Sequence, residues 1–444
     1  MAKLTFVGGL HPYDGKELSK DKPIRELLPG NELVYPLSQH IGAPARAAVK
    51  KGDRVLAGQK IADPGGIVSA PVHATVSGTV KALEPRRLVT GDSCMSIVVE
   101  NDGLYEDAGF YPVAPLEKLT KEEIIGIIQE AGIVGMGGAG FPTHVKLSPK
   151  TPEKIRHVIA NCAECEPYLT SDYRRMLEEP EKLVGGLRIL LRLFEHATGI
   201  LAVEDNKPDC IRVLRELTKG SGRISVKALK TKYPQGAERQ LIYAVTGRKI
   251  NFSMLPAAVG CIVNNVDTMV AVYRAVIEGR PLMERIVTVT GDAVAAPRNF
   301  RVRIGMSYEE LLNGAGGFRV PPEKLVCGGP MMGFAMFGLD VPVTKTSTAL
   351  LAFSHDEAAA EPGPCIGCGR CVEVCPGRVV PSRLAAAAQN GEEEVFLKLQ
   401  GMECCECGCC SYICPAKRPL TQWIKSMRKL ELAKRNAAHS SKAN

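Results

Sequence analysis

Short apolar runs broken by glycine mark the first part of the chain. Between Val34 and Val99, β-branched residues alternate with polar ones in segments such as VKKGDRVLAGQKIADPGG and APVHATVSGTV. Runs of this length, bounded by turn-forming residues, are typical of β-strands. We therefore predict a β-rich N-terminal domain over residues 1–115.

A helical period replaces this pattern further along the chain. The apolar residues of Thr120–Gly132 recur at helical spacing, and Glu123 follows Thr120 by three positions, as in a capping box. Beyond a group of glycines, KIRHVIANC predicts a buried strand, EKLVGGLRILLRLFEHA a helix and TGILAVED another strand. Alternating strands and helices predict a layered α/β domain, which we place at residues 116–284.

Three further segments complete a multidomain chain of mixed α/β and α+β class. Residues 285–353 open with a strand, a turn, a second strand and a short helix, which predicts a small β-grasp unit. Residues 354–364, SHDEAAAEPGP, are predicted to be a linker. Residues 365–444 hold most cysteines and end in PLTQWIKSMRKLEL, a predicted amphipathic helix. Its expected apolar face comprises Leu420, Trp423, Ile424, Met427 and Leu430.

Positive charge is concentrated at the C-terminal end. The chain has a formal net charge of +8, and residues 416–444 carry eight Lys or Arg against the single acid Glu431. Because the remainder is nearly neutral, we expect no nucleic-acid partner. The basic end predicts docking to an acidic partner or an anionic membrane surface, or else a solvated helix end.

Hydropathy gives no sign of a membrane-spanning or secreted protein. No run of about eighteen uncharged apolar residues occurs, and the N-terminus MAKLTFVGGLHPYDG lacks the apolar region of a secretion signal. We expect a cytoplasmic chain without a transmembrane segment.

Ten of the sixteen cysteines lie between Cys365 and Cys414. Two runs, CIGCGRCVEVCP and CCECGCCSYICP, share the spacing C-x2-C-x2-C-x3-C-P of bacterial ferredoxins, in which the fourth cysteine ligates the other cluster. This pattern predicts two [4Fe–4S] clusters. The expected ligands are Cys365, Cys368, Cys371 and Cys414 for the first cluster, and Cys404, Cys407, Cys410 and Cys375 for the second.

Other roles for the cysteines fit the spacing less well. Pairs spaced C-x2-C also build zinc sites, but four-ligand zinc has no use for the third cysteine and the proline. Cys405 and Cys409 fall outside the repeated spacing and are predicted not to ligate. Cys162 and Cys165 form one C-x2-C without a second pair, so we expect free thiols there.

A glycine-rich loop supplies a candidate cofactor site. In VGMGGAGFPTHVK, bare glycines let backbone amides approach a phosphate or a flat ring, and Lys146 adds a positive charge. A nicotinamide transfers two electrons and an iron–sulfur cluster one, so a chain that joins them needs a flavin. The loop follows a helix, whereas a Rossmann fingerprint follows a strand, so by itself it could be only a tight turn.

Four motifs in order strengthen the flavin prediction. GMGGAGFPTHVK, NCAECEPYLTSDYR, YPQGAERQLI and VNNVDT resemble the NADH- and FMN-binding subunit of respiratory complex I. The β-rich segment resembles half-repeats of the barrel-sandwich domain of biotinyl and lipoyl carriers, although the carrier lysine is replaced by Asp63-Pro64-Gly65-Gly66. With FVGGLHP, an SLBB-like β-grasp unit and the cysteine runs, nearly the whole chain resembles the C subunit of the Rnf-type ion-translocating ferredoxin:NAD oxidoreductase.

The resemblance implies a peripheral subunit on the cytoplasmic side of the cell membrane. Such a subunit exchanges electrons between NAD(H) and FMN, and passes them through two [4Fe–4S] clusters to or from integral membrane and other subunits of the complex, and indirectly ferredoxin. No side chain is required as acid or base, so no catalytic residue is assigned. The residues that the resemblance places in the FMN and nucleotide cleft are Gly135, Gly137, Gly138, Ala139, Gly140, Lys146, Asn161, Glu164, Glu166, Gly236, Glu238, Asn264, Asn265 and Thr268.

The motifs also allow plainer roles. Asn264 and Asn265 could cap the following helix, and Glu164 and Glu166 could pair with Arg174 or Arg175. The complex I motifs have an aspartate at the position of Ala163 and a second glutamate at the position of Ala237. Two other functions are therefore considered: a soluble reductase on the same scaffold, such as cobalamin reductase, and an electron-carrying adaptor that binds no nucleotide.

Overall fold

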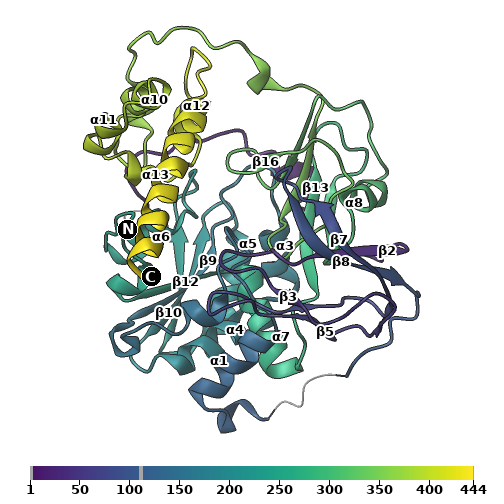
Figure 1. Cartoon of the computed structure of the whole chain (residues 1–444). Coiled ribbons are helices and arrows are strands. Elements are labelled where there is room, and N and C mark those ends of the chain that lie inside the picture. Colours follow the sequence, from purple (N-terminus) through teal and green to yellow (C-terminus); the bar gives the residue numbers. More distant parts are fainter. Residues whose placement is uncertain (1–3, 110–113, 444) are drawn as a thin grey trace.

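The computed structural model in Figure 1 describes residues 4–109 and 114–443, with the side chains of the last helix described through residue 437. Its N-terminal part is built of two antiparallel sheets, as the alternating pattern predicted. The strands of the larger sheet, in spatial order, are β2 (Glu32–Pro36), β8 (Ser93–Asn101), β7 (Gly78–Arg87) and β4 (Arg54–Val55). Those of the smaller sheet are β3 (Arg46–Ala47), β5 (Lys60–Asp63) and β6 (Val72–His73).

A parallel four-stranded sheet forms the middle of the molecule. Its strands, in spatial order, are β11 (Ile224–Leu229), β10 (Thr198–Glu204), β9 (His157–Cys162) and β12 (Cys261–Asn265). The chain moves outward from β9 to β11 and then returns to the other side of β9, so the strand order reverses between β9 and β12. In open α/β sheets, ligands bind outside the carboxyl ends of the strands at such a switch point.

Helices pack around this sheet because their apolar faces are buried against it. The predicted capping box is confirmed at the first of them, where Thr120 accepts a hydrogen bond from the amide of Glu123. Gly186 lies so close to the backbone of Met269 that a Cβ there would clash. The absence of a side chain at Gly186 therefore lets the helices that carry these two residues pack closely. The helices of this part are α1 (Lys121–Glu130), α2 (Thr143–Lys146), α3 (Ser171–Glu178), α4 (Pro180–Leu193), α5 (Pro208–Thr218), α6 (Glu238–Thr246) and α7 (Val266–Glu278).

The predicted β-grasp unit is part of a six-stranded sheet. Its strands, in spatial order, are β1 (Arg25–Leu27), β14 (Arg298–Arg303), β13 (Glu284–Thr290), β17 (Ala349–Phe353), β15 (Lys324–Cys327) and β16 (Phe334–Ala335). Helix α8 (Tyr308–Gly314) begins with a second capping box, formed by Ser307 and Glu310. Strand β1 comes from the N-terminal segment, and Tyr35 shares one buried cluster with Phe300, so the two β-rich parts have a common core.

The cysteine-rich region is helical. Its helices are α9 (Arg370–Glu373), α10 (Pro381–Gln389), α11 (Glu393–Lys398), α12 (Cys409–Tyr412) and α13 (Leu420–Ala443). On α13, Leu420, Ile424 and Met427 are buried as predicted. The expectation that Leu430 shares this apolar face is wrong, because its side chain is 49% exposed.

The N-terminal segment ties distant parts of the chain together. Leu4 forms a parallel bridge with Leu229, and Leu10 an antiparallel bridge with Tyr233. The amide of Gly9 donates to the carbonyl of Val374 over 2.7 Å, so the same segment reaches the cysteine-rich region. We call residues 4–10 the N-terminal strap. Within residues 4–109 and 114–443, no helix is both long and apolar enough to cross a membrane.

Candidate cofactor sites

The predicted flavin residues gather at the switch point of the parallel sheet. Asn161 lies at the carboxyl end of β9, and Asn264 and Asn265 end the neighbouring strand β12, with Asn265 opposite Asn161 in the register. Gly137 lies against Asn265, where a Cβ would approach the asparagine Cβ to 2.8 Å. The glycine loop therefore reaches the switch point although it does not follow a strand.

Backbone contacts shape the glycine loop. Gly135 donates to the carbonyl of Phe141 over 2.9 Å, which closes the loop between α1 and α2, and Met136 donates to the Thr268 hydroxyl over 3.1 Å. Gly140 has a φ of +72°, a left-handed conformation that favours glycine. Gly138 is exposed and has open space where a Cβ would stand. This exposed turn, which also includes Ala139, can be approached closely by a flat ring or a phosphate.

The side chain of Asn264 has no hydrogen-bond partner among the described residues. It is 3% exposed, and neither its amide nitrogen nor its amide oxygen has a partner in the described structure. Gln235, which is fully buried in the YPQGAE motif, is in the same condition. Buried polar atoms are nearly always paired, so these two amides fit a bound ligand with donors and acceptors, as the polar edge of a flavin has.

Two charged residues lie near each other beside these amides. Lys146 donates to the carbonyl of Val263 over 2.8 Å, on the strand that carries Asn264. Burial lowers the pKa of the Lys146 ammonium, and the neighbouring Glu238 partly opposes this. Burial likewise raises the pKa of the Glu238 carboxyl. A cation next to orphaned amides is the donor set that the phosphate-bearing FMN requires, so the residues present fit this cofactor.

Several predicted residues instead hold the site together. Asn161 donates to the carbonyl of Gly236 over 2.8 Å, and the Gly236 amide donates to the Cys165 sulfur over 3.2 Å. These two hydrogen bonds hold the NCAEC and YPQG motifs together. Asn265 accepts from the amide of Asp267 over 2.8 Å and so caps α7, which confirms the plainer role considered for it.

The two glutamates do not pair with Arg174 or Arg175, so that alternative is wrong. Glu164 accepts hydrogen bonds from the first amides of α3, at 2.7 and 3.2 Å, because its carboxylate takes the place of a missing side-chain cap. Glu166 accepts from the amide of Met331 over 3.1 Å. The Lys16 ammonium donates to the backbone carbonyls of both glutamates over 3.0 Å. Sequence reasoning missed Lys16, which lies well outside the four motifs.

A cavity lies at the centre of the cysteine-rich region. It is lined by Cys375 together with Cys404, Cys407 and Cys410, the residues predicted to ligate the second cluster. Cys405 and Cys409 also line it. Cys375, the cysteine before Pro376, thus lines the same cavity as three cysteines of the other run, and their ligation of one cluster stays a prediction.

The first predicted ligand set is more open. Cys365 and Cys368 are exposed, whereas Cys371 and Cys414 are half-buried beside the hydrophobic cluster of this region. Over the part of the chain that the structure describes, no three His, Cys, Asp or Glu side chains are grouped to hold a single metal ion.

The two cysteine runs adopt the same backbone conformation. Left-handed φ angles recur at equivalent positions: Gly367 and Glu406, Gly369 and Gly408, and Arg378 and Lys417, with values between +49° and +81°. A non-glycine residue in this region is strained by about 1–2 kcal/mol. Such strain persists where surrounding structure or a functional site demands it, and its repetition in both runs indicates one loop design used twice.

The flavin-site motif YPQGAER touches the second cysteine run directly. The hydroxyl of Tyr233 donates to the carbonyl of Cys407 over 2.7 Å. Gln240, the residue after this motif, donates to the carbonyl of Pro376 at the end of the first run over 3.4 Å. Arg239 forms an ion pair of 3.0 Å with Glu403, directly before Cys404.

Comparison with known proteins agrees with this geometry. Three family models match: the RnfC barrel sandwich hybrid domain at residues 4–104, the Nuo51 FMN-binding domain at residues 128–274 and the SLBB domain at residues 286–335. The C subunit of the Na(+)-translocating ferredoxin:NAD(+) oxidoreductase complex of Acetobacterium woodii is 43% identical over 433 residues, which cover 97% of this chain and 98% of the relative. The chain belongs to the RnfC family.

Other RnfC relatives differ in length. The relative from the proton-translocating complex of Clostridium ljungdahlii is 43% identical, with 87% of this chain and 85% of the relative covered. For the ion-translocating complex of Pseudomonas aeruginosa the identity is 41%, but the match spans only 51% of the relative. A solved structure of NAD+-reducing [NiFe]-hydrogenase, in the air-oxidized state, shares the fold at 20% identity with a TM-score of 0.50, over 67% of this chain and 59% of the hydrogenase chain.

Proposed function

We propose that this RnfC chain exchanges electrons between NAD(H) and FMN at the switch point, and between FMN and two [4Fe–4S] clusters of the cysteine-rich region. When bound, FMN supplies the conversion between two-electron and one-electron transfer. The contact between Tyr233 of the flavin-site motif and the Cys407 carbonyl carries the proposal, because it joins the two sites without intervening structure.

The protein's own residues have distinct tasks in this function. Asn264 and Gln235 would orient the flavin through their unpaired amides, the exposed backbone of Gly138 would admit the cofactor, and Lys146 would face its negative charge. Cys375, Cys404, Cys407 and Cys410 would hold the second cluster. The helix cap from Asn265 and the clasp from Asn161 keep the two strand ends in place.

The contacts also support an order for the two proposed clusters. The second cysteine run abuts the flavin-site motif, whereas Cys365 and Cys368 of the first run are exposed. We therefore place the second cluster next to the flavin and the first at the surface, where partner subunits of an Rnf-type complex, and through them ferredoxin, would exchange electrons with it. In this arrangement the chain works as a peripheral subunit on the cytoplasmic side of the membrane.

Replacement of Asn264 tests the flavin site. Asn264→Leu removes both orphaned amide atoms and keeps the side-chain volume, so we expect roughly tenfold weaker FMN retention, for a loss of about 1.4 kcal/mol in hydrogen bonding. The unfolding midpoint should not fall, because no intramolecular hydrogen bond is broken. Bound FMN per chain, measured by fluorescence after anaerobic reconstitution, reports the result.

The control for this experiment is Asn313→Leu, which changes an exposed asparagine on α8. The control should retain FMN and show NADH-dependent bleaching of the iron–sulfur absorbance. Unchanged FMN retention in Asn264→Leu would contradict the proposed site. A chain that takes up about eight irons but never FMN would instead be the electron-carrying adaptor.

A further inference from the structure

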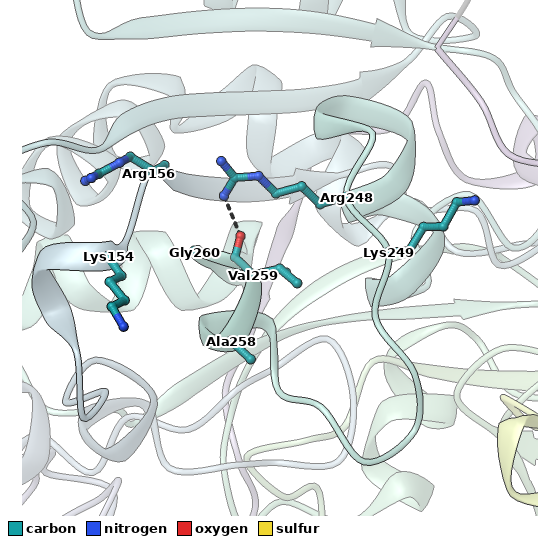
Figure 2. Close-up of a pocket in the computed structure, with 7 residues that line it drawn as sticks. All are labelled: Lys154, Arg156, Arg248, Lys249, Ala258, Val259 and Gly260. Atoms are coloured by element: carbon teal, nitrogen blue, oxygen red, sulfur yellow. Dashed lines mark hydrogen bonds between the residues drawn. The ribbon is translucent and has the colours of Figure 1, made fainter.

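A basic hollow opens at the amino ends of β9 and β12, at the edge of the sheet opposite the flavin site. The amides of Arg156 and His157 donate to the carbonyl of Gly260 at 2.8 and 3.1 Å, which ties the starts of the two strands together beneath it. The hollow has a volume of about 560 Å³. Figure 2 shows its lining residues: Lys154, Arg156, Arg248, Lys249, Ala258, Val259 and Gly260.

The four cations of this hollow lack acidic partners. Arg248 donates to the carbonyl of Val259, and Arg156 donates to the carbonyl of Glu153 over 2.9 Å, so both guanidinium groups contact neutral backbone. Lys154 and Lys249 are exposed. Among the described residues, no carboxylate forms an ion pair with any of these four side chains, so their positive charge remains uncompensated.

The basic end of the chain behaves differently. Arg428 and Lys425 on α13 pair with Glu406, and Lys434 pairs with Glu393. Two carboxylates from outside this end of the chain, Glu406 and Glu393, therefore neutralise part of the charge that the sequence concentrates there. The hollow, which composition does not reveal, is the better candidate for attracting an external anion.

Apolar surface borders the hollow. Leu255 is 72% exposed and begins the short turn that carries Ala258 and Val259. In the same loop, the ring of Phe252 lies 5.1 Å from the guanidinium of Arg435 on α13, so the helix borders this loop. An exposed leucine flanked by cations is typical of surfaces that bind anionic lipid headgroups and insert an apolar side chain between them.

We propose that this hollow binds the phosphate groups of anionic phospholipids and docks the chain on the membrane surface. The inference rests on the proposed function at a membrane-bound complex and adds a lipid contact to it. The seven lining residues include no aromatic ring for a base and no carboxylate for a ribose, which favours a bare phosphate over a nucleotide. The site is separate from the switch point, so lipid and NAD(H) would not compete.

Vesicle co-sedimentation of the full reconstituted chain tests this proposal. Vesicles of phosphatidylcholine with phosphatidylglycerol should bind the chain, whereas vesicles of phosphatidylcholine alone should not. Lys154→Glu with Lys249→Glu reverses two exposed charges, and each charge near an anionic surface contributes about fivefold to binding. We expect at least tenfold weaker binding for this double variant, and several-fold weaker binding for Leu255→Ser.

The control is Lys50→Glu with Lys51→Glu, which reverses two exposed charges on a turn of the N-terminal domain. It should bind anionic vesicles like the unaltered chain. Equal binding by the Lys154 and Lys249 variant, or equal loss in both double variants, would overturn the proposal. Binding of inorganic phosphate to the hollow without any binding to anionic vesicles would also overturn it, because the hollow would then be a site for a small free anion.

The proposed function can fail independently of this inference. All variants should retain FMN and NADH-dependent bleaching, because the hollow lies at the opposite edge of the sheet. Loss of vesicle binding with intact bleaching supports the lipid site, whereas absent bleaching in every chain, including the unaltered one, would count against the electron-transfer function alone.

Discussion

At the scale of single residues, hydrogen bonding separates scaffold from ligand contacts among asparagines of the same motifs. Asn161 hydrogen-bonds backbone groups, and Asn265 hydrogen-bonds one backbone amide and the carboxylate of Asp172. The side-chain amide of Asn264 makes no hydrogen bond in the described structure. All three are asparagines at strand ends, so residue type could not have told them apart. The distinction depends on which backbone groups the fold brings within reach.

Glu284 provides a residue-scale prediction about pH. Burial alone would raise the pKa of its carboxyl, but the guanidinium groups of Arg274 and Arg301 outweigh this and lower the pKa to about 2. In the unfolded chain the carboxylate takes up its proton near its ordinary pKa of about 4.3. The ion pairs therefore stabilise the fold above that pH, and this stability is lost as the pH falls towards 2.

Glu284→Gln should reduce the free energy of unfolding by on the order of 3 kcal/mol at pH 7. The difference in the free energy of unfolding between the variant and the unaltered chain should narrow as the pH falls below about 4.5. Urea unfolding from pH 7 to pH 3 measures this difference. A gap that stays constant over this range would show that the carboxylate charge contributes nothing.

At the scale of elements, the repeated cysteine loops place the strictest demands on the chain. Gly369 and Gly408 occupy equivalent positions before the short helices α9 and α12, with φ of +76° and +81°. A Cβ at Gly369 would meet nothing within 4 Å, but at Gly408 it would lie 2.9 Å from the carbonyl of Met331. The two glycines therefore form a matched pair that differs mainly in packing.

Alanine at these positions separates backbone strain from packing. Gly369→Ala should cost about 1–2 kcal/mol from the left-handed backbone alone. Gly408→Ala should cost more and should also lower the iron content, because Met331 packs against the buried cluster to which Cys407 and Cys409 belong. Iron and sulfide per chain, with paramagnetic resonance of the reduced protein, distinguish the two. Equal iron content in both variants would contradict the packing argument.

Sequence patterns predicted an element well where the residues that determine it lie within that element. The capping box at Thr120, the strand β9 and the helix α4 all follow from spacing within a few residues. Strand β1 could not be predicted in the same way, because it pairs with β14, far away in the sequence. Its three residues carry no apolar alternation and become a strand only through that partner.

At the scale of the whole molecule, the N-terminal strap joins the flavin site to the cysteine-rich region. Gly9 has a φ of +75°, and a Cβ there would lie 2.5 Å from the carbonyl of Tyr233. Its amide meanwhile donates to the carbonyl of Val374. The motif FVGGLHP contributes to the family resemblance. A glycine is needed at Gly9 because of the carbonyls of Tyr233 and Val374, which are far away in the sequence.

Gly9→Ala should loosen this junction. In the unaltered chain, flavin release and loss of iron–sulfur absorbance should coincide during thermal unfolding. In Gly9→Ala we expect them to separate into two transitions. Gly220→Ala is the control, because Gly220 has a φ of +78° but no neighbour within 4 Å of a Cβ. A single transition in Gly9→Ala, with only the shift seen in the control, would contradict a joining role for the strap.

The strap also has a consequence for biosynthesis. The strap is synthesised well before Val374, which accepts the hydrogen bond of Gly9. The bridges of the strap to Leu229 and Tyr233 can therefore form first, whereas the Gly9 hydrogen bond must wait until the cysteine-rich region has emerged. Maturation factors that deliver iron and sulfide would therefore reach the cysteine-rich region before the strap is hydrogen-bonded to it.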